Sequence, residues 1–266
     1  MAKTSKYIAR EPDAFGVIDY TPDEHGLWRD LMGAQLPLLP GRACGLYLRG
    51  LDILDLPEDR IPQCGEVSAR LSPATGWRVK PVAALIPFDE FFQLLKDRVF
   101  PAASFIRSRE EFRYLEEPDI FHEIFGHTPL LTDPSIAEFS QNIGRIGVAA
   151  PAEYHVWLAR LYWMTIEFGL LKTPRGLRAL GAGIMSSNEE LIYALENDLP
   201  ERRPFEVISA LRTPYRIDQL QPIYYVLENL DQLLALTEVD LLTQIDEAKR
   251  LGLFPLIETA AAHQAA

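Results

Sequence analysis

From residue 87 onward, apolar side chains recur every three or four residues, and this helical period limits the fold more than any other feature of the sequence. The pattern begins in PFDEFFQLLKDRVF, where Pro87 stands near the helix start, a position that proline favours. It recurs in 118–126 and 151–171, and the segments 186–197 and 221–252 are predicted to add two or three more helices. A mainly α fold, of α+β type with a few short strands, is therefore predicted.

The first 80 residues differ, because they are rich in Pro and Gly and lack long periodic runs. They are predicted to form short helices, loops and a few short strands that wrap the helical part. One strand candidate is GWRVKPVAALI, whose Pro81 confines it to an edge or a strand start. No change of composition after residue 87 marks a second domain. We expect a single catalytic domain, 1–266, with a wrapping region at 1–80, a helical core at 81–240 and a C-terminal helix and tail at 241–266.

Composition excludes several classes of partner. The chain has 26 Lys+Arg and 38 Asp+Glu, a net charge of −12, which argues against nucleic acid and anionic membrane surfaces as partners. No apolar run approaches the ~18 residues of a membrane span, and the N-terminus lacks the apolar stretch of a signal peptide. The two cysteines, Cys44 and Cys64, are expected to be reduced thiols. We expect a cytoplasmic protein that binds small molecules and neither nucleic acid nor membrane.

Two of the five histidines lie close together in PDIFHEIFGHTP. The zinc-protease motif H-E-x-x-H needs its second histidine one helical turn after the first. Here Gly126 holds that position and His127 follows one residue later. On a continuous α-helix five residues correspond to an offset of about 140°, too wide for one metal ion. If Gly126 ends the helix, however, His127 can turn to face His122.

Glu167 is the carboxylate that stands out, because it lies in the apolar run LYWMTIEFGLL. Burying it without a cation would cost several kcal/mol or force it to take up a proton. Arg160 is one candidate partner, and a metal ion is the other. Two histidines and one carboxylate form the facial triad of non-haem Fe(II) oxygenases. From the residues alone, two core histidines and an ion-paired glutamate are the favoured interpretation, and the triad remains the alternative.

The same stretches resemble the aromatic amino acid hydroxylase family, most closely its bacterial members that act on phenylalanine. The resemblance spans about residues 75–235 in family-like order, and the shorter match EHGLWRDL extends it toward the N-terminus. The matching segments are TGWRVKPVAALIP, RVFPAASFIR, PDIFHEIFGHTPLLTDPSIAEFSQNIG, LYWMTIEFGL, GAGIMSSNEELIYAL and QPIYYVLENLDQL.

The resemblance implies a monooxygenase of phenylalanine catabolism that converts L-phenylalanine to L-tyrosine with O2, Fe(II) and tetrahydrobiopterin or a related pterin. It implies that His122, His127 and Glu167 are the three iron ligands. For the pterin it implies stacking on Phe91, hydrogen bonding to the backbone of Leu85 and Ile86, and further contacts with Glu123, Ala159 and Tyr162. Of these, Glu123 and Tyr162 are the candidate catalytic residues. Taken alone, Phe91 is better explained by core packing of an amphipathic helix.

For the substrate, the resemblance implies that Arg107 clamps the carboxylate, a role suited to a guanidinium. It also implies that Trp163 forms an aromatic wall and that Ser186 and Ser187 lie near the amino and carboxyl groups. From the residues alone, Arg107 belongs to a charged surface run. Ser187 and Glu190 also form a capping-box pattern at the start of the next helix, and both interpretations can hold together.

The chain departs from animal members of the family at two positions. Leu115 replaces a threonine that helps to hold the substrate, and Ile217 stands where the tyrosine-hydroxylating branch has an acidic residue, which favours phenylalanine. The chain also has no room for the regulatory domain or tetramerising helix of animal members, so we expect a monomer.

Three alternatives remain at this point. The first is a hydroxylase of the same family that acts on tryptophan, tyrosine or another ring position. The second is a zinc hydrolase that uses His122, Glu123 and His127, against which the spacing counts. The third is a non-catalytic binding protein, against which the complete set of three ligands counts.

Overall fold

The computed structural model describes residues 7–83, 86–113 and 117–257. The predicted wrapping region holds three regular helices, α1 (Pro22–Gln35), α2 (Gly45–Leu54) and α3 (Cys64–Thr75), and a 3₁₀ turn, η1 (Leu36–Leu38). Thr21 and Glu24 form a capping box at the start of α1, which satisfies backbone N–H groups left free at a helix end. Between residues 7 and 77 no strand forms, so of the few short strands predicted for this region only the one that begins near residue 78 is present.

The predicted strand at 76–86 is confirmed as β1 (Arg78–Val82), which pairs in parallel with β2 (Val99–Ala103). Helix α4 (Phe88–Lys96) connects the two strands. Because this sheet has only two strands, each is an edge strand. Pro81, which cannot donate a ladder hydrogen bond, is therefore tolerated.

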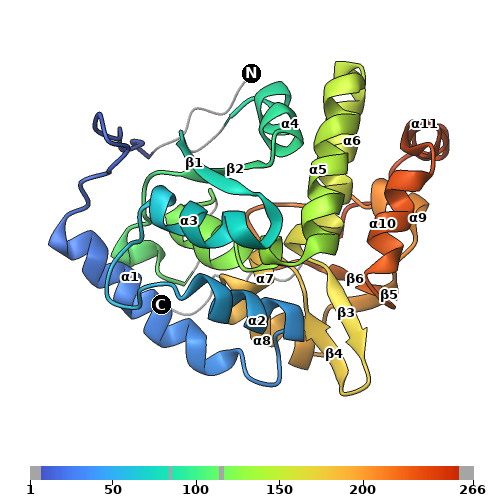
Figure 1. Ribbon diagram of the computed structural model, residues 1–266. Coiled ribbons are helices and arrows are strands. Elements are labelled where there is room, and N and C mark those ends of the chain that lie inside the picture. The colour runs from blue at the N-terminus through green and yellow to red at the C-terminus, as the bar shows by residue number, and fades with distance from the viewer. Residues whose placement is uncertain (1–6, 84–85, 114–116, 258–266) are drawn as a thin grey trace.

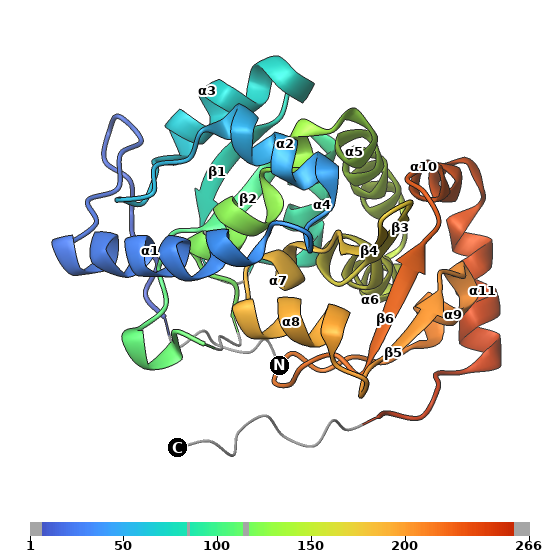
Figure 2. The same ribbon diagram turned by 90° about the horizontal axis from the view of Figure 1, so that it is seen from below.

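The centre of the molecule is helical, and two of its turns are π-helical. The 3₁₀ turn η2 (Arg109–Glu111) precedes the first π-helix, η3 (His122–His127), and the 3₁₀ turn η4 (Leu130–Thr132) follows it. Helices α5 (Pro134–Ala149) and α6 (Ala152–Tyr162) stand side by side in Figures 1 and 2, and α6 continues into a second π-helix, η5 (Trp163–Glu167). The helix predicted at 151–171 thus ends four residues early, because Leu170 already lies in the next strand, β3.

A second sheet has the strand order β4-β3-β6-β5. Its strands are β3 (Leu170–Thr173), β4 (Gly176–Ala179), β5 (Glu201–Pro204) and β6 (Ile223–Leu227). The prediction that 221–252 is entirely helical is wrong for β6. Four of the five residues IYYVL are β-branched or aromatic and all five are buried, as is typical of an inner strand that is covered on both faces.

The remaining helices surround this sheet. They are α7 (Ala182–Met185), α8 (Asn188–Glu196), α9 (Val207–Arg212), α10 (Asp231–Glu238) and α11 (Leu241–Leu251). Figures 1 and 2 show α1 and α3 on one side of α5 and α6, and α9, α10 and α11 on the opposite side. One continuous cluster of buried apolar residues extends from Ile18 to Ala248. The prediction of a mainly α fold with a few short strands is confirmed. No helix in the described part of the chain is long and apolar enough to cross a membrane.

Candidate active site

The two clustered histidines lie at the first and last positions of the π-helix η3. A π-helix bonds residues five apart, so His122 and His127 come to lie one turn apart. Their Nε2 atoms are 3.1 Å from each other. The predicted convergence of the two imidazoles is correct, but the predicted cause is wrong: the helix does not end at Gly126, and the wider helical turn supplies the geometry.

Gly126 has a different role. A Cβ atom on this residue would lie 2.8 Å from the carbonyl oxygen of Ala182 in α7. Only glycine therefore lets α7 pack directly against η3. This contact also places Ser186, the residue after α7, next to His122.

Glu167, the last residue of the second π-helix, brings its carboxylate to the same point. Its oxygens lie 2.7 Å from Nε2 of His127 and 3.6 Å from Nε2 of His122. Arg160, the alternative partner, instead donates to the carbonyl oxygen of Leu211. A carboxylate oxygen of Glu123 also lies within 4.8 Å of the two imidazoles, but Glu167 is the carboxylate in direct contact with them.

The charges at this point shift one another's pKa values. Burial opposes ionisation of Glu167, but the two imidazoles hold its pKa well below the usual range. Burial lowers the pKa of His122, and the Glu167 carboxylate outweighs this effect and raises it to about 8. For His127 burial prevails, so its pKa falls. Burial raises the pKa of Glu123 to about 8. Glu167 thus keeps its negative charge in a buried position, where the positive charge of a protonated imidazole or of a bound cation stabilises it.

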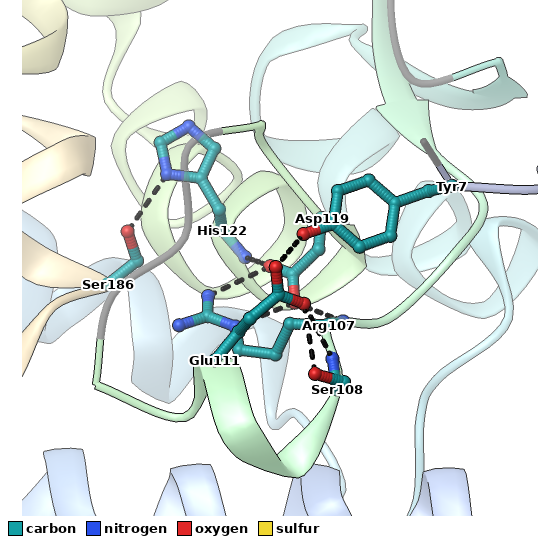
Figure 3. A network of polar contacts seen from close by, with 7 residues as sticks. All are labelled: Tyr7, Arg107, Ser108, Glu111, Asp119, His122 and Ser186. Atoms are coloured by element: carbon teal, nitrogen blue, oxygen red, sulfur yellow. Dashed lines mark hydrogen bonds and ion pairs between the residues drawn. The ribbon is translucent and has the colours of Figure 1, made fainter. Parts of the chain in front are cut away.

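A second layer of polar contacts orients His122 (Figure 3). The hydroxyl of Ser186 donates to the carbonyl oxygen of Ala182 at 2.9 Å and lies 2.9 Å from Nδ1 of His122. Since its single hydrogen goes to Ala182, the hydroxyl accepts from Nδ1–H. This arrangement leaves Nε2 of the neutral imidazole free to bind a metal ion.

Asp119 links Arg107 to the backbone of His122 in the same network of polar contacts (Figure 3). Its carboxylate accepts the backbone N–H of His122 at 3.0 Å and both Nε and Nη2 of Arg107, at 2.8 and 2.9 Å. Arg107 is buried, so the surface interpretation of this residue is wrong. The bidentate face of its guanidinium group is already paired with Asp119. Within the described residues, Nη1 is left without a hydrogen bond.

A cavity of about 270 Å³ opens above the three converging side chains. Every predicted metal ligand lines it, and so do most of the residues predicted for the pterin side. The predicted residues in its wall are His122, His127, Glu167, Ile86, Phe91, Glu123, Ala159, Tyr162 and Trp163.

Other predicted residues lie outside the cavity wall. Arg107 and Ser186 approach it only through their contacts with Asp119 and His122. Ser187 caps α8 by accepting the backbone N–H of Glu190 at 3.2 Å, and Ile217 is exposed. Leu85 and Leu115 lie outside the described residues.

Several residues of the site were missed from the sequence, and three of them bear on its chemistry. Tyr215 lines the cavity and stacks on Trp163, with ring centroids 4.3 Å apart. Phe100 lines it next to His127, at 4.7 Å between ring centroids. Asp119 could have been suspected from its place before IFHE, since a buried arginine needs a carboxylate. Tyr215 had no comparable local signal, because a loop distant in sequence brings it to the site.

Comparisons with known proteins agree with this geometry. Residues 3–239 match the family of biopterin-dependent aromatic amino acid hydroxylases. The phenylalanine-4-hydroxylase of Pseudomonas aeruginosa is 53% identical over 251 residues, which are 94% of this chain and 95% of that protein. The solved phenylalanine hydroxylase of Legionella pneumophila superposes with a TM-score of 0.90 at 49% identity, covering 94% of this chain and 99% of that one. That of Chromobacterium violaceum with bound oxidised Fe(III) has a TM-score of 0.87 at 39% identity, covering 92% and 89%.

Proposed function

The chain belongs to the biopterin-dependent aromatic amino acid hydroxylase family, and from this membership we propose that it is a phenylalanine 4-monooxygenase. The reaction converts L-phenylalanine to L-tyrosine with O2, a tetrahydropterin and Fe(II). The observation that carries the proposal is the convergence of His122, His127 and Glu167 at the floor of one cavity.

The residues present fit an iron ion. Metal–nitrogen bonds are about 2.0–2.1 Å long, so donors at right angles around one metal lie about 3 Å apart. The two Nε2 atoms are 3.1 Å apart, and the nearest Glu167 oxygens lie 2.7 and 3.6 Å from them. The buried Glu167 carboxylate needs positive charge nearby, which a divalent cation supplies. Two imidazoles and one carboxylate on one face leave open positions, as in non-haem Fe(II) oxygenases.

The aromatic side chains in the cavity wall support binding of both the pterin and the aromatic substrate. Fe(II) and the reduced pterin, when bound, supply the electrons that cleave O2 and deliver one oxygen atom to the ring. We assign the pterin to the side lined by Phe91, Ile86, Ala159 and Tyr162, with the Glu123 carboxyl group between this side and the iron ligands. Leu85 is assigned to the same side from the family resemblance alone.

The substrate ring is assigned to the wall formed by Trp163 and Tyr215, since stacked aromatic rings offer an apolar surface of the right shape. Arg107 is assigned to the substrate carboxylate through Nη1, because its Nε–H and one N–H of Nη2 donate to Asp119. Asp119 then keeps the guanidinium oriented and contacts the backbone of His122, linking substrate binding to the metal site. Ser186 fixes the His122 tautomer, and Ser187 mainly caps α8.

The test is an anaerobic reconstitution with Fe(II), tetrahydrobiopterin and L-phenylalanine, followed by air, with products separated by chromatography. Tyrosine should form only when all components are present. Glu167→Ala should bind no iron and form no tyrosine while keeping its circular dichroism spectrum. Pterin oxidation without tyrosine would indicate that the substrate is another aromatic amino acid or that another ring position is hydroxylated. Tightly bound iron without any pterin oxidation would overturn the proposal.

We also propose a monomer in the cytoplasm. The acidic net charge of −12 supports a protein that works free of nucleic acid and anionic membranes. The division at residues 80 and 240 belongs to this proposal too, with 81–240 carrying the iron and pterin sites. Sedimentation velocity tests the monomer, because a dimer would sediment faster than a 30.1 kDa particle.

A further inference from the structure

A buried carboxyl group outside the metal site takes no part in the reaction assigned above. Glu190, in the first turn of α8, is 5% exposed. The capping-box pattern predicts that it turns back to the backbone N–H of Ser187, but that N–H donates to the carbonyl oxygen of Ile184. The Glu190 carboxylate instead accepts the backbone N–H of Gln221 at 3.1 Å and the hydroxyl of Tyr224. It therefore fastens a segment more than thirty residues away.

Gln221 extends this contact to the substrate pocket. Its buried side chain donates from Nε2 to the carbonyl oxygens of Arg216 and Gln219, at 2.9 and 3.2 Å. Its Oε1 accepts from the indole Nε1 of Trp163 at 3.4 Å. One residue thus closes the loop 213–222 and contacts the edge of the indole.

The same loop contacts the face of the indole. Tyr215 stacks on Trp163 with the ring planes 16° apart, and both rings line the cavity. The orientation of Trp163 therefore depends on the loop at two points, Tyr215 at its face and Gln221 at its edge. The Glu190 carboxyl group holds the backbone of that loop from outside the cavity.

We propose that Glu190 is a positioning residue for the aromatic wall of the substrate pocket, acting through Gln221 and the loop 213–222 on Trp163 and Tyr215. The occupant of the pocket, L-phenylalanine, rests on the proposed function. The carboxyl group acts as a hydrogen-bond acceptor within the fold and touches neither substrate nor metal ligands.

A neutral amide should replace Glu190 in this role. Burial raises the pKa of Glu190 to about 7, so the group is close to half protonated at neutral pH. The side-chain oxygen of glutamine can accept both hydrogen bonds, whereas alanine removes the acceptor. Glu189, the exposed neighbour on the same helix, provides the matched control.

The kinetic test compares Glu190→Ala, Glu190→Gln and Glu189→Gln. Without this acceptor the backbone N–H of Gln221 and the hydroxyl of Tyr224 lose their partner, so the loop that carries Tyr215 and Gln221 is no longer held against Trp163. Glu190→Ala should therefore raise the KM for phenylalanine about tenfold while the KM for the pterin stays within about twofold. Both Gln variants should keep both constants. Equal rises of both constants, or an unchanged KM for phenylalanine in a folded Glu190→Ala protein, would overturn the proposal.

A second readout is independent of activity. The protein is labelled with 5-fluorotryptophan, whose four resonances are assigned by substitution, the Trp163 signal by Trp163→Phe. Glu190→Ala should move or broaden the Trp163 resonance alone, and Glu190→Gln should leave it in place. If the wild-type protein forms no tyrosine, the proposed function fails, and this spectrum decides the positioning role on its own. A Trp163 resonance unchanged by Glu190→Ala would refute it.

If Glu190→Ala does not fold, Tyr224→Phe replaces it, since it removes one of the two donors and keeps the ring. It should move the Trp163 resonance and the KM for phenylalanine in the same direction by a smaller amount. No change in either quantity would count against the proposal.

Discussion

At Asp119, one buried carboxylate accepts four hydrogen bonds from two residues, Arg107 and His122. Burial opposes its ionisation, but Arg107 and the backbone donors hold its pKa below 3.8. The stability contributed by this group is therefore present above the unfolded pKa and is lost as pH falls through the lower folded pKa.

Asp119→Asn should lower the free energy of unfolding by about 3–5 kcal/mol, because it leaves the Arg107 guanidinium buried beside an uncharged partner. Urea unfolding at pH 7 measures the effect. The control is Glu196→Gln, which breaks the exposed ion pair with Arg42 and should cost about 0–1 kcal/mol. Equal effects of the two substitutions would mean that the buried ion pair contributes no more to the free energy of unfolding than the exposed one.

The stability contributed by Glu190 should depend on pH in the opposite direction. Its folded pKa is raised from 4.5 to about 7 by burial, with Tyr224 and Gln221 opposing and Glu189 adding to the rise. The folded state holds the proton more tightly, so this contribution is present below pH 4.5 and is lost as pH rises to 7. Relative to Glu190→Gln, the wild type should lose about 3 kcal/mol of unfolding free energy between pH 4.5 and 8. A constant difference across this range would contradict the shift.

At the residue scale, the sequence largely predicted which side chains form the metal site. A carboxylate in an apolar run and two histidines within six residues are local features of the sequence. The contacts that these side chains make could not be predicted from the local sequence. The pairing of Arg107 with Asp119, rather than exposure to solvent, requires the loop after β2 to fold against η3.

Among the secondary-structure elements, η3 and α7 pack closely against each other, and this contact constrains the metal site. Gly126→Ala would place a methyl group 2.8 Å from the carbonyl oxygen of Ala182. Overpacking of this kind typically costs about 1–3 kcal/mol. We expect that loss in chemical denaturation, together with weaker iron binding, because α7 carries Ser186 to His122.

The control is Gly33→Ala in α1, where a Cβ atom meets nothing within 4 Å. Alanine is the better helix former there, so this substitution should raise stability by up to about 1 kcal/mol. Destabilisation by both substitutions would point to a general intolerance of the added methyl group rather than to the contact with α7.

Helical periodicity predicted the existence of most elements but neither their exact type nor every boundary. It cannot distinguish a π-helix from an α-helix, because the extra residue per turn is decided by what the turn packs against. It also predicted a helix at IYYVL where a strand forms, since a short buried strand and a buried helix show the same continuous apolar run. Pairing of β6 with β3 and β5 decided that case.

At the scale of the whole molecule, a metal ion should tie together segments that are far apart in sequence. A ligand that binds only the folded state at 100 times its Kd adds about 2.7 kcal/mol, which for a chain of this size raises Tm by about 5–10 °C. Fe(II) added anaerobically to the metal-free protein should give this rise in calorimetry, and chelation should reverse it. Glu167→Ala should show no rise. An equal rise in this variant would place the metal elsewhere.

By itself, the sequence determined the predominance of helix, the three candidate metal ligands and the resemblance that names the chemistry, because these depend on residue types and on short spacings. The tertiary structure alone decided how His127 faces His122, that Glu167 approaches the two imidazoles rather than Arg160, and that Glu190 contacts the loop behind Trp163. Those outcomes depend on packing between segments 31 to 64 residues apart, such as Glu190 with Gln221 and His122 with Ser186. The burial of one segment by another creates these contacts, and no local pattern encodes it.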